Sequence, residues 1–340
     1  MGQTLSEPVT KKKSACCRDN NYRVGSSCMQ GWRIKMEDSH VHILSLPSDP
    51  GTAFFAVYDG HGGTYKRTFS TETEQTDLLR NGAGATMAQH AGKHLHEYII
   101  KRSEYKAGDI VEGIQQGFLE LDKAMQNNAT LRDEHAGTTV IALLVKDNIL
   151  YSANAGDSRA VACIGGKTVQ LSRDHKPTLK DERKRIEAAG GFVEYKRVNG
   201  NLALSRALGD FIFKRNDHKS PQEQIVTAFP EVQQFPISEE WEFVVLACDG
   251  IWDVMTSEEV VKFVRTRLAQ TKLGDAESHR NVTIHPEEIC EELLNCCLAP
   301  DALMGTGCDN MTVILVCFLH GRPCSQLVLR CQDLSPSIDL

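Results

Sequence analysis

Residues 138–164 read TTVIALLVKDNILYSANAGDSRAVACI, and this stretch decides the fold class. It contains three apolar runs, at 138–145, 149–155 and 160–164, which are typical of buried strands. Only three residues, 146–148, separate the first run from the second. A crossover helix needs many more residues, so neighbouring strands must pair antiparallel. A parallel doubly wound sheet is therefore disfavoured.

Further strands and helices extend this pattern along the chain. Apolar runs predict strands at 53–58, 243–247 and 311–318. Helical spacing occurs in clusters between the strand groups, at 92–102, 109–126, 180–189, 257–270 and 286–298. This order predicts an α+β fold in one unit, with the strands packed together and the helices outside. The longest apolar runs fall well short of the roughly 20 residues that span a bilayer, so we expect no membrane span.

Composition excludes several classes of protein. The chain has 340 residues, with 38 basic and 45 acidic side chains, and the resulting net charge of −7 makes nucleic acid an improbable partner. Its twelve cysteines show no Cys-x-x-Cys spacing, and the N-terminus has no apolar signal segment. We therefore expect reduced thiols, without a disulfide framework or a zinc site.

Acidic residues occur beside several of the predicted strands. Asp59 and Asp249 each follow an apolar run as part of an Asp-Gly pair, Asp309 precedes the last run, and Glu37 and Asp38 lie upstream of the first. One Asp-Gly pair alone is more often a turn than a ligand. Carboxylates gathered at one end of a sandwich would repel one another unless a cation neutralised them. An all-oxygen set favours Mg²⁺ or Mn²⁺.

Six motifs occur in an order that resembles one known family, the metal-dependent protein serine/threonine phosphatases of the PPM class, type 2C. They are Arg33 with MED at 36–38, VYDGHGG at 57–63, AGDSR at 155–159, NGNLALSRALGD at 199–210, CDGIWD at 248–253 and DNMT at 309–312. The resemblance covers residues 22–320. It implies two antiparallel sheets packed as a central β-sandwich flanked by helices, in four layers. It also implies hydrolysis of phosphoserine and phosphothreonine in proteins.

The resemblance implies a centre of two Mg²⁺ or Mn²⁺ ions with a bridging hydroxide as the nucleophile. Asp59 would bridge the two ions, and the Gly60 carbonyl would bind one of them. Three further carboxylates, Glu37, Asp249 and Asp309, would bind the other. Asp38 would hold metal-bound water, although a merely solvated acid is an open alternative.

Other site residues follow from the same resemblance. Arg33 would bind the phosphate with its guanidinium fork, and His61 would protonate the leaving oxygen. Asp157 and Asp253, sharing Asp249, would hold a third and weaker ion, but Asp-Ser-Arg after a strand is also a common turn. Arg206 lies near the end of a flap predicted at 175–207, where it is a candidate for a substrate contact.

Two alternatives stay open beside the active phosphatase. Residues 64–87 form an insertion about twenty residues longer than expected, directly after His61, and we read them as a flexible loop. A catalytically impaired member that binds phosphoproteins or regulates other proteins is therefore one alternative. A hydrolase of small phosphoesters or nucleotides is the other, although the chain lacks a Walker loop.

The ends of the chain are predicted to be tails, at 1–21 and 321–340. Gly2 with Ser6 fits the N-myristoylation pattern, and the lysines at 11–13 and cysteines at 16–17 would supply a second membrane signal. We therefore expect a cytoplasmic monomer with peripheral membrane association, and the nucleus stays open as a location.

Overall fold

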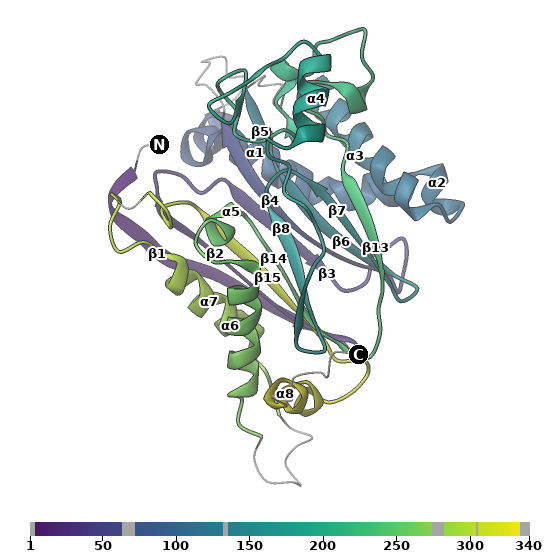
Figure 1. Ribbon diagram of the computed structural model, residues 1–340, viewed down its shortest axis with the longest axis vertical. Coiled ribbons are helices and arrows are strands. Elements are labelled where there is room, and N and C mark those ends of the chain that lie inside the picture. Colours follow the sequence, from purple (N-terminus) through teal and green to yellow (C-terminus); the bar gives the residue numbers. More distant parts are fainter. Residues whose placement is uncertain (1–3, 63–71, 132–134, 274–281, 304, 334–340) are drawn as a thin grey trace.

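The structure is a computed structural model that describes residues 4–62, 72–131, 135–273, 282–303 and 305–333, with the backbone alone for 72–81. Two antiparallel β-sheets lie face to face (Figure 1), as predicted. One sheet has six strands in the order β1 (Thr4–Arg18), β2 (Tyr22–Arg33), β15 (Met311–Phe318), β14 (Trp241–Ala247), β8 (Arg159–Ile164) and β9 (Lys167–Gln170).

The other sheet has seven strands. Six follow the order β12 (Leu208–Gly209), β5 (Ala136–Thr138), β4 (Ala53–Gly62), β6 (Val140–Lys146), β7 (Ile149–Ala155) and β13 (Glu231–Pro236), and β3 (Asp38–Ile43) pairs with β4. The turn between β6 and β7 has two residues, Asp147 and Asn148, both at positive φ, and confirms the predicted hairpin.

Strand β4 shows why this region reads as a continuous apolar run. Phe55 and Val57 pack in the core between the two sheets, whereas Phe54, Ala56 and Tyr58 pack in the core between the seven-stranded sheet and its helices. Successive side chains of a strand point to opposite faces. Both faces are covered, so neither set of positions is polar.

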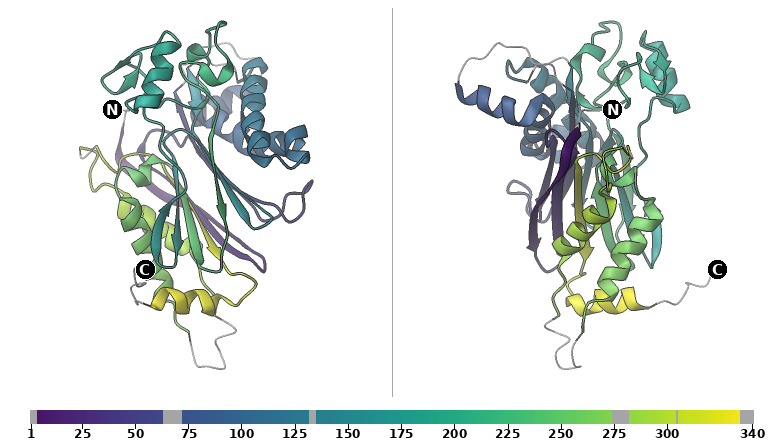
Figure 2. Two further views of the ribbon diagram at one scale, coloured as in Figure 1. Left: turned by 45° about the vertical axis from the view of Figure 1, so that its right-hand side comes forward. Right: turned by 90° about the vertical axis from the view of Figure 1, so that its left-hand side faces the viewer.

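Helices cover both outer faces of the sandwich (Figures 1 and 2). The seven-stranded sheet carries α1 (Glu72–Lys101), α2 (Ser103–Lys106) and α3 (Ile110–Asn127), and the six-stranded sheet carries α6 (Ser257–Ala269), α7 (Pro286–Cys297) and α8 (Cys324–Gln332). The predicted four layers are confirmed. The short helix α5 (Asp249–Trp252) follows β14, while α4 (Lys180–Ala188) and the hairpin of β10 (Val193–Glu194) and β11 (Arg197–Val198) form the flap segment. In the described part of the chain, no helix has the length and apolar character needed to cross a bilayer.

The predicted N-terminal tail is wrong for most of its length. Residues Thr4–Arg18 form β1, which pairs antiparallel with β2, with Thr4 opposite Arg33 and Arg18 opposite Arg23. β1 is the edge strand of its sheet, and most of its side chains are solvent-exposed. Backbone hydrogen bonds to β2 hold β1 in place, and its side chains therefore show no apolar pattern that would predict a strand. Gly2 lies outside the described residues.

The predicted loop and C-terminal tail also need correction. Within 64–87 the helix α1 begins at Glu72 and has non-helical φ/ψ at Gly82, and its buried Ala85 and Met87 belong to the folded core. The part of the insertion up to residue 71 lies outside the described residues. Within 321–340 the helix α8 buries Leu327 and Val328 against the six-stranded sheet.

All twelve cysteines are free thiols, as the composition predicts.

Candidate metal centre and active site

The predicted metal ligands meet where strands of the two sheets end. β3 and β4 pair so that Asp38 lies directly opposite Asp59. From the other sheet, β14 ends at Ala247 and leads through Cys248 into Asp249, the first residue of α5. Asp309 lies just before β15, the neighbour of β14. The sandwich therefore brings together carboxylates that are far apart in the sequence.

The carboxylates raise one another's pKa values, because they are buried close together. Burial raises the pKa of Asp59 well above its ordinary value, and the charges of Asp249, Asp38, Asp309 and Asp157 raise it further. The pKa of Asp249 is raised in the same way, by burial first and then by neighbouring acids. A group of acids that resist ionisation together calls for a cation among them.

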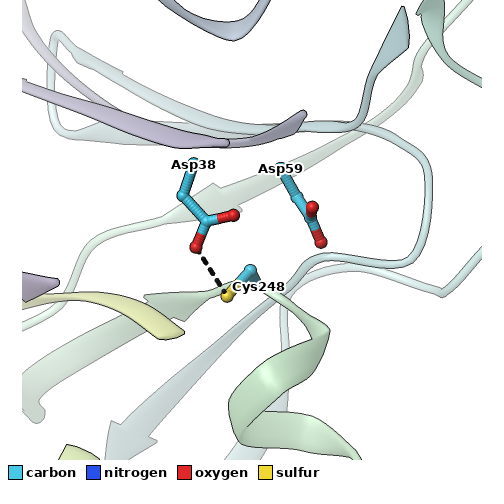
Figure 3. Close-up of side chains that lie close together, drawn as sticks. All are labelled: Asp38, Asp59 and Cys248. Atoms are coloured by element: carbon cyan, nitrogen blue, oxygen red, sulfur yellow. Dashed lines mark hydrogen bonds between the residues drawn. The ribbon is translucent and has the colours of Figure 1, made fainter. Parts of the chain in front are cut away.

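In this group, one carboxylate oxygen of Asp38 has no hydrogen-bond partner among the described residues. Figure 3 shows Asp38 and Asp59 extending from one sheet toward Cys248 of the other. Thr312 Oγ1 donates to Asp38 Oδ2 at 2.7 Å and the Cys248 thiol donates to the same oxygen at 3.3 Å. The other oxygen, Oδ1, is buried without a hydrogen-bond partner among the described residues. Burial raises the pKa of Asp38 to about 7.

Cys248 joins the two aspartates in a group whose ligand atoms lie within 4.8 Å of one another. Burial raises the pKa of its thiol well above the ordinary value, and the charges of Asp38 and Asp59 raise it further. The thiol therefore stays protonated and acts as a hydrogen-bond donor. Only a thiolate is a good metal ligand, so Cys248 is excluded from the set of metal ligands. The donor set that remains is oxygen, which fits Mg²⁺ or Mn²⁺.

Asn310 positions Glu37, a role that was not predicted from the sequence. Its side-chain Oδ1 accepts from the Glu37 backbone N–H at 2.8 Å, and its Nδ2 donates to the carbonyls of Gln30 and Lys35 at 2.8 and 2.9 Å. Burial raises the pKa of Glu37, although Lys35 and other cationic neighbours lower it. The position of Asn310 directly after Asp309, in a quoted motif, was the available signal.

The end of β4 is tightly packed against α1. A Cβ atom on Gly60 would lie 2.4 Å from the Gly84 carbonyl oxygen and 2.5 Å from that of Glu37. A Cβ atom on Gly84 would lie 2.5 Å from the backbone nitrogen of His61. The last residues of the insertion therefore form a wall of the candidate site, which the prediction of a separate loop missed.

His61 pairs with Asp210, the last residue of the NGNLALSRALGD motif, for which no role was predicted. The imidazole Nε2 lies 2.7 Å from Asp210 Oδ2, and Asp210 has a left-handed φ of 52°. Burial acts to lower the pKa of His61, but Asp210 and other acids outweigh it and raise the pKa. A Cβ atom on Gly137 would lie 2.3 Å from the same Asp210 oxygen, so only glycine fits beneath this pair.

Arg33 lies at the end of β2 and forms an ion pair with Asp309. Burial acts to lower the pKa of Arg33, but Asp309, Asp249 and Asp59 raise it. With 41% of its side chain exposed, the guanidinium can be reached from solvent. The structure thus brings a permanent cation to the carboxylate group at a solvent-accessible position.

The residues of the predicted third ion site also come together, with a lysine among them. Asp157 is buried, and its Oδ2 lies 2.5 Å from Lys176 Nζ. Partial burial raises the pKa of Asp253, Lys176 lowers it and Asp157 raises it, so all three groups interact. The ammonium of Lys176 therefore already neutralises part of the charge that a third ion would neutralise.

Arg206 differs from the expectation of a substrate contact. Its Nη2 donates to Glu182 Oε1 at 2.6 Å, and its Nη1 donates to the Phe229 carbonyl at 3.1 Å. Glu182 is buried and also pairs with Arg185 at 2.7 Å. These bonds direct the Arg206 guanidinium into the flap segment, where it holds α4 in place.

Comparisons with known proteins agree with this geometry. A family model described as protein phosphatase 2C matches residues 22–82 and 70–303. A probable protein phosphatase 2C of Caenorhabditis elegans is 52% identical over 332 residues, which cover 97% of this chain and 84% of the relative. Protein phosphatase 1B of Mus musculus is 38% identical, with 96% of this chain and 78% of the relative covered.

The crystal structure of a phosphatase from a pathogenic strain of Toxoplasma gondii superposes with a TM-score of 0.69 at 26% identity. The superposition covers 92% of this chain and 97% of that one. The predicted fold and enzyme class are confirmed by these matches. The chain therefore belongs to the protein phosphatase 2C family of metal-dependent serine/threonine protein phosphatases.

Proposed function

We propose that the chain removes phosphate from phosphoserine and phosphothreonine of proteins with two Mg²⁺ or Mn²⁺ ions. Asp59 and the carbonyl of Gly60 would hold one ion, and Asp59 with Glu37, Asp249 and Asp309 the other. The observation that carries this proposal is the convergence of buried acids with raised pKa values from both sheets. Ions bound there would lower the pKa of a water molecule and so supply a nucleophile at neutral pH.

Asp38 is suited to orient that water. Its Oδ2 is occupied by Thr312 and Cys248, and only the buried Oδ1 is left to accept a hydrogen bond. A carboxylate that is fixed at one oxygen presents the other in a defined direction. A water molecule held in the right geometry reacts with a lower activation free energy, because its translational and rotational entropy is already lost on binding.

Arg33 is suited to bind the phosphate. A planar guanidinium donates two parallel hydrogen bonds to two phosphate oxygens and keeps its charge at any working pH. Asp309 holds one end of the group, so its orientation is fixed before the substrate arrives. The phosphate would then lie between Arg33 and the carboxylates.

His61 is suited to protonate the leaving alkoxide. Asp210 Oδ2 accepts a hydrogen bond from Nε2 and raises the pKa of His61, which favours the protonated imidazole over that of a free histidine. Nδ1 is then the nitrogen from which a proton would pass to the serine or threonine oxygen. This proton transfer avoids release of an unprotonated alkoxide, a poor leaving group.

A phosphate-release assay on a phosphothreonine peptide tests the proposal. We expect activity with Mn²⁺ or Mg²⁺ and loss of activity with chelator or in Asp249→Asn, which removes a ligand charge at nearly constant size. Asp147→Asn is a matched control, because Asp147 is exposed in the β6–β7 turn. Undiminished turnover in metal-free buffer would refute the metal mechanism. Binding of the peptide without turnover, in either Mg²⁺ or Mn²⁺, would favour the catalytically impaired alternative. Faster release of phosphate from nucleotides than from the peptide would favour the small-phosphoester alternative.

A further inference from the structure

A second cationic site lies at the other end of β2. Arg33 ends this strand on the side of the candidate active site, and Arg23 lies ten residues away, near its start. At roughly 3.3 Å per residue, the two arginines are about 33 Å apart. Arg23 lines a cavity of about 670 Å³ together with Arg18 and Arg322. This volume lies in the range of small-molecule sites.

Backbone hydrogen bonds fix the walls of this cavity. The β1–β2 turn is tied to the segment after β15 by two bonds, from the Leu319 N–H to the Asn21 carbonyl at 2.7 Å and from the Gly321 N–H to the Asn20 carbonyl at 3.1 Å. Within the turn, Asp19 Oδ1 accepts from the backbone of Asn21 and Tyr22. The arginines are therefore carried by segments held against each other.

Arg23 is the strongest sign of a ligand. Its side chain lies on the cavity wall, the residue is only 8% exposed, and its Nε is buried without a hydrogen-bond partner among the described residues. A buried donor of a charged group that lacks a hydrogen-bond partner destabilises the fold, because its lost hydration is not replaced. Arginines at this depth are normally paired with an anion.

Helix α8 supplies a second and independent sign. Its first residue, Cys324, and its N-cap, Pro323, line the same cavity. Proline has no side-chain acceptor, and this nine-residue helix has no side-chain hydrogen bond at its N-cap. The first amides of a helix point outward with a partial positive charge, which favours an anion.

The acids around the cavity offset only part of this charge. Asp19 also lines it, and its Oδ1 is engaged in the turn. Glu239 pairs with Arg322 at the rim. In the described part of the chain, no carboxylate pairs with Arg18 or Arg23, and the helix N-terminus adds to their positive charge.

We propose that this cavity binds the phosphate group of a small phosphate monoester or of inorganic phosphate, at a site separate from the active site. Arg23 would donate from the cavity wall, Arg18 and Arg322 from its rim, and the α8 amides from another wall. A guanidinium fork and helix amides both match phosphate oxygens. A phosphate on a soluble molecule and a phosphate on a lipid headgroup share this chemistry.

Binding is tested with the full chain in metal-free buffer, where no phosphate is released. The probes are inorganic phosphate, glycerol 3-phosphate, and phosphatidylcholine vesicles containing phosphatidylinositol 4-phosphate. Calorimetry should show saturable binding that weakens roughly tenfold or more in Arg23→Met, which keeps an unbranched apolar stem but loses the donors of the guanidinium. Saturation by soluble probes assigns a free phosphate, and binding to vesicles alone assigns a headgroup.

Control variants separate this cavity from the active site. Arg33→Ala should leave the binding unchanged, and so should Arg183→Gln, which alters an exposed arginine of α4. Equal affinity of wild type and Arg23→Met, or no saturable binding of any probe, overturns the proposal, as does loss of binding in Arg33→Ala. If Arg23→Met does not fold, the double variant Arg18→Gln/Arg322→Gln at the rim is measured in its place. A roughly tenfold loss of affinity supports the proposal, and an affinity equal to that of the wild type overturns it.

Discussion

Raising the pH should destabilise the metal-free protein, with Asp38 as a main cause. Burial raises the pKa of this carboxyl from 3.8 to about 7 in the folded chain. Between these two values the native state holds a proton that the unfolded state has lost, so stability falls as the pH rises through about 7. A shift of about three pKa units corresponds to a loss on the order of 4 kcal/mol. The raised pKa values of Asp59 and Asp249 act in the same direction.

Urea unfolding of chelator-treated protein at about pH 5 and pH 8 measures the part of this loss that occurs above pH 5. Asp38→Asn is the matched variant, because an amide oxygen still accepts from Thr312 and Cys248. From the lower to the higher pH, its free energy of unfolding should gain about 3 kcal/mol relative to the wild type, because only about two units of the pKa shift lie above pH 5. Mn²⁺ should stabilise the wild type more at the higher pH, because binding displaces fewer protons there. Equal losses of stability in wild type and variant would refute the role of Asp38.

Three further predictions concern the active site. Arg33→Ala should raise KM with little change in kcat, because the guanidinium binds phosphate in ground and transition states alike; a loss in kcat at constant KM would contradict this. Asp210→Asn should move the basic limb of the kcat–pH profile to lower pH, because Asp210 raises the pKa of His61; an unmoved limb would assign the proton to another group. Gly84→Ala should lower kcat/KM about 100-fold by displacing the end of β4. Unchanged kinetics would show that α1 does not position His61.

Strands covered on both faces by apolar residues were predictable, whereas β1 and β2 of the six-stranded sheet were not. A strand covered on both faces, such as β4, is apolar throughout and easily identified. β2 contains Gly25, Ser26 and Ser27 at its buried centre, because small residues are needed there. A Cβ on Gly25 would lie 2.1 Å from the Glu287 backbone nitrogen of α7. This close approach depends on a helix more than 250 residues away, which no local pattern reveals.

The candidate site shows the same division. Carboxylates next to strand ends stand out in the sequence, and the structure brings all of them together. Their supporting contacts do not stand out, because Cys248 and Thr312 reach Asp38 across the two sheets, and Asp210 reaches His61 over 149 positions. Such pairs are set by tertiary packing, and a single sequence contains no signal of which residues meet.

The register of β1 places the start of this strand beside the candidate active site. Thr4 lies opposite Arg33, so the chain begins at the end of the sheet that carries the candidate active site. Only Gln3 separates Gly2 from β1, a reach of about 7 Å at full extension. An acyl chain on Gly2 would therefore hold the catalytic mouth next to the bilayer. We propose that such an anchored enzyme would work on phosphorylated segments that lie close to the lipid surface.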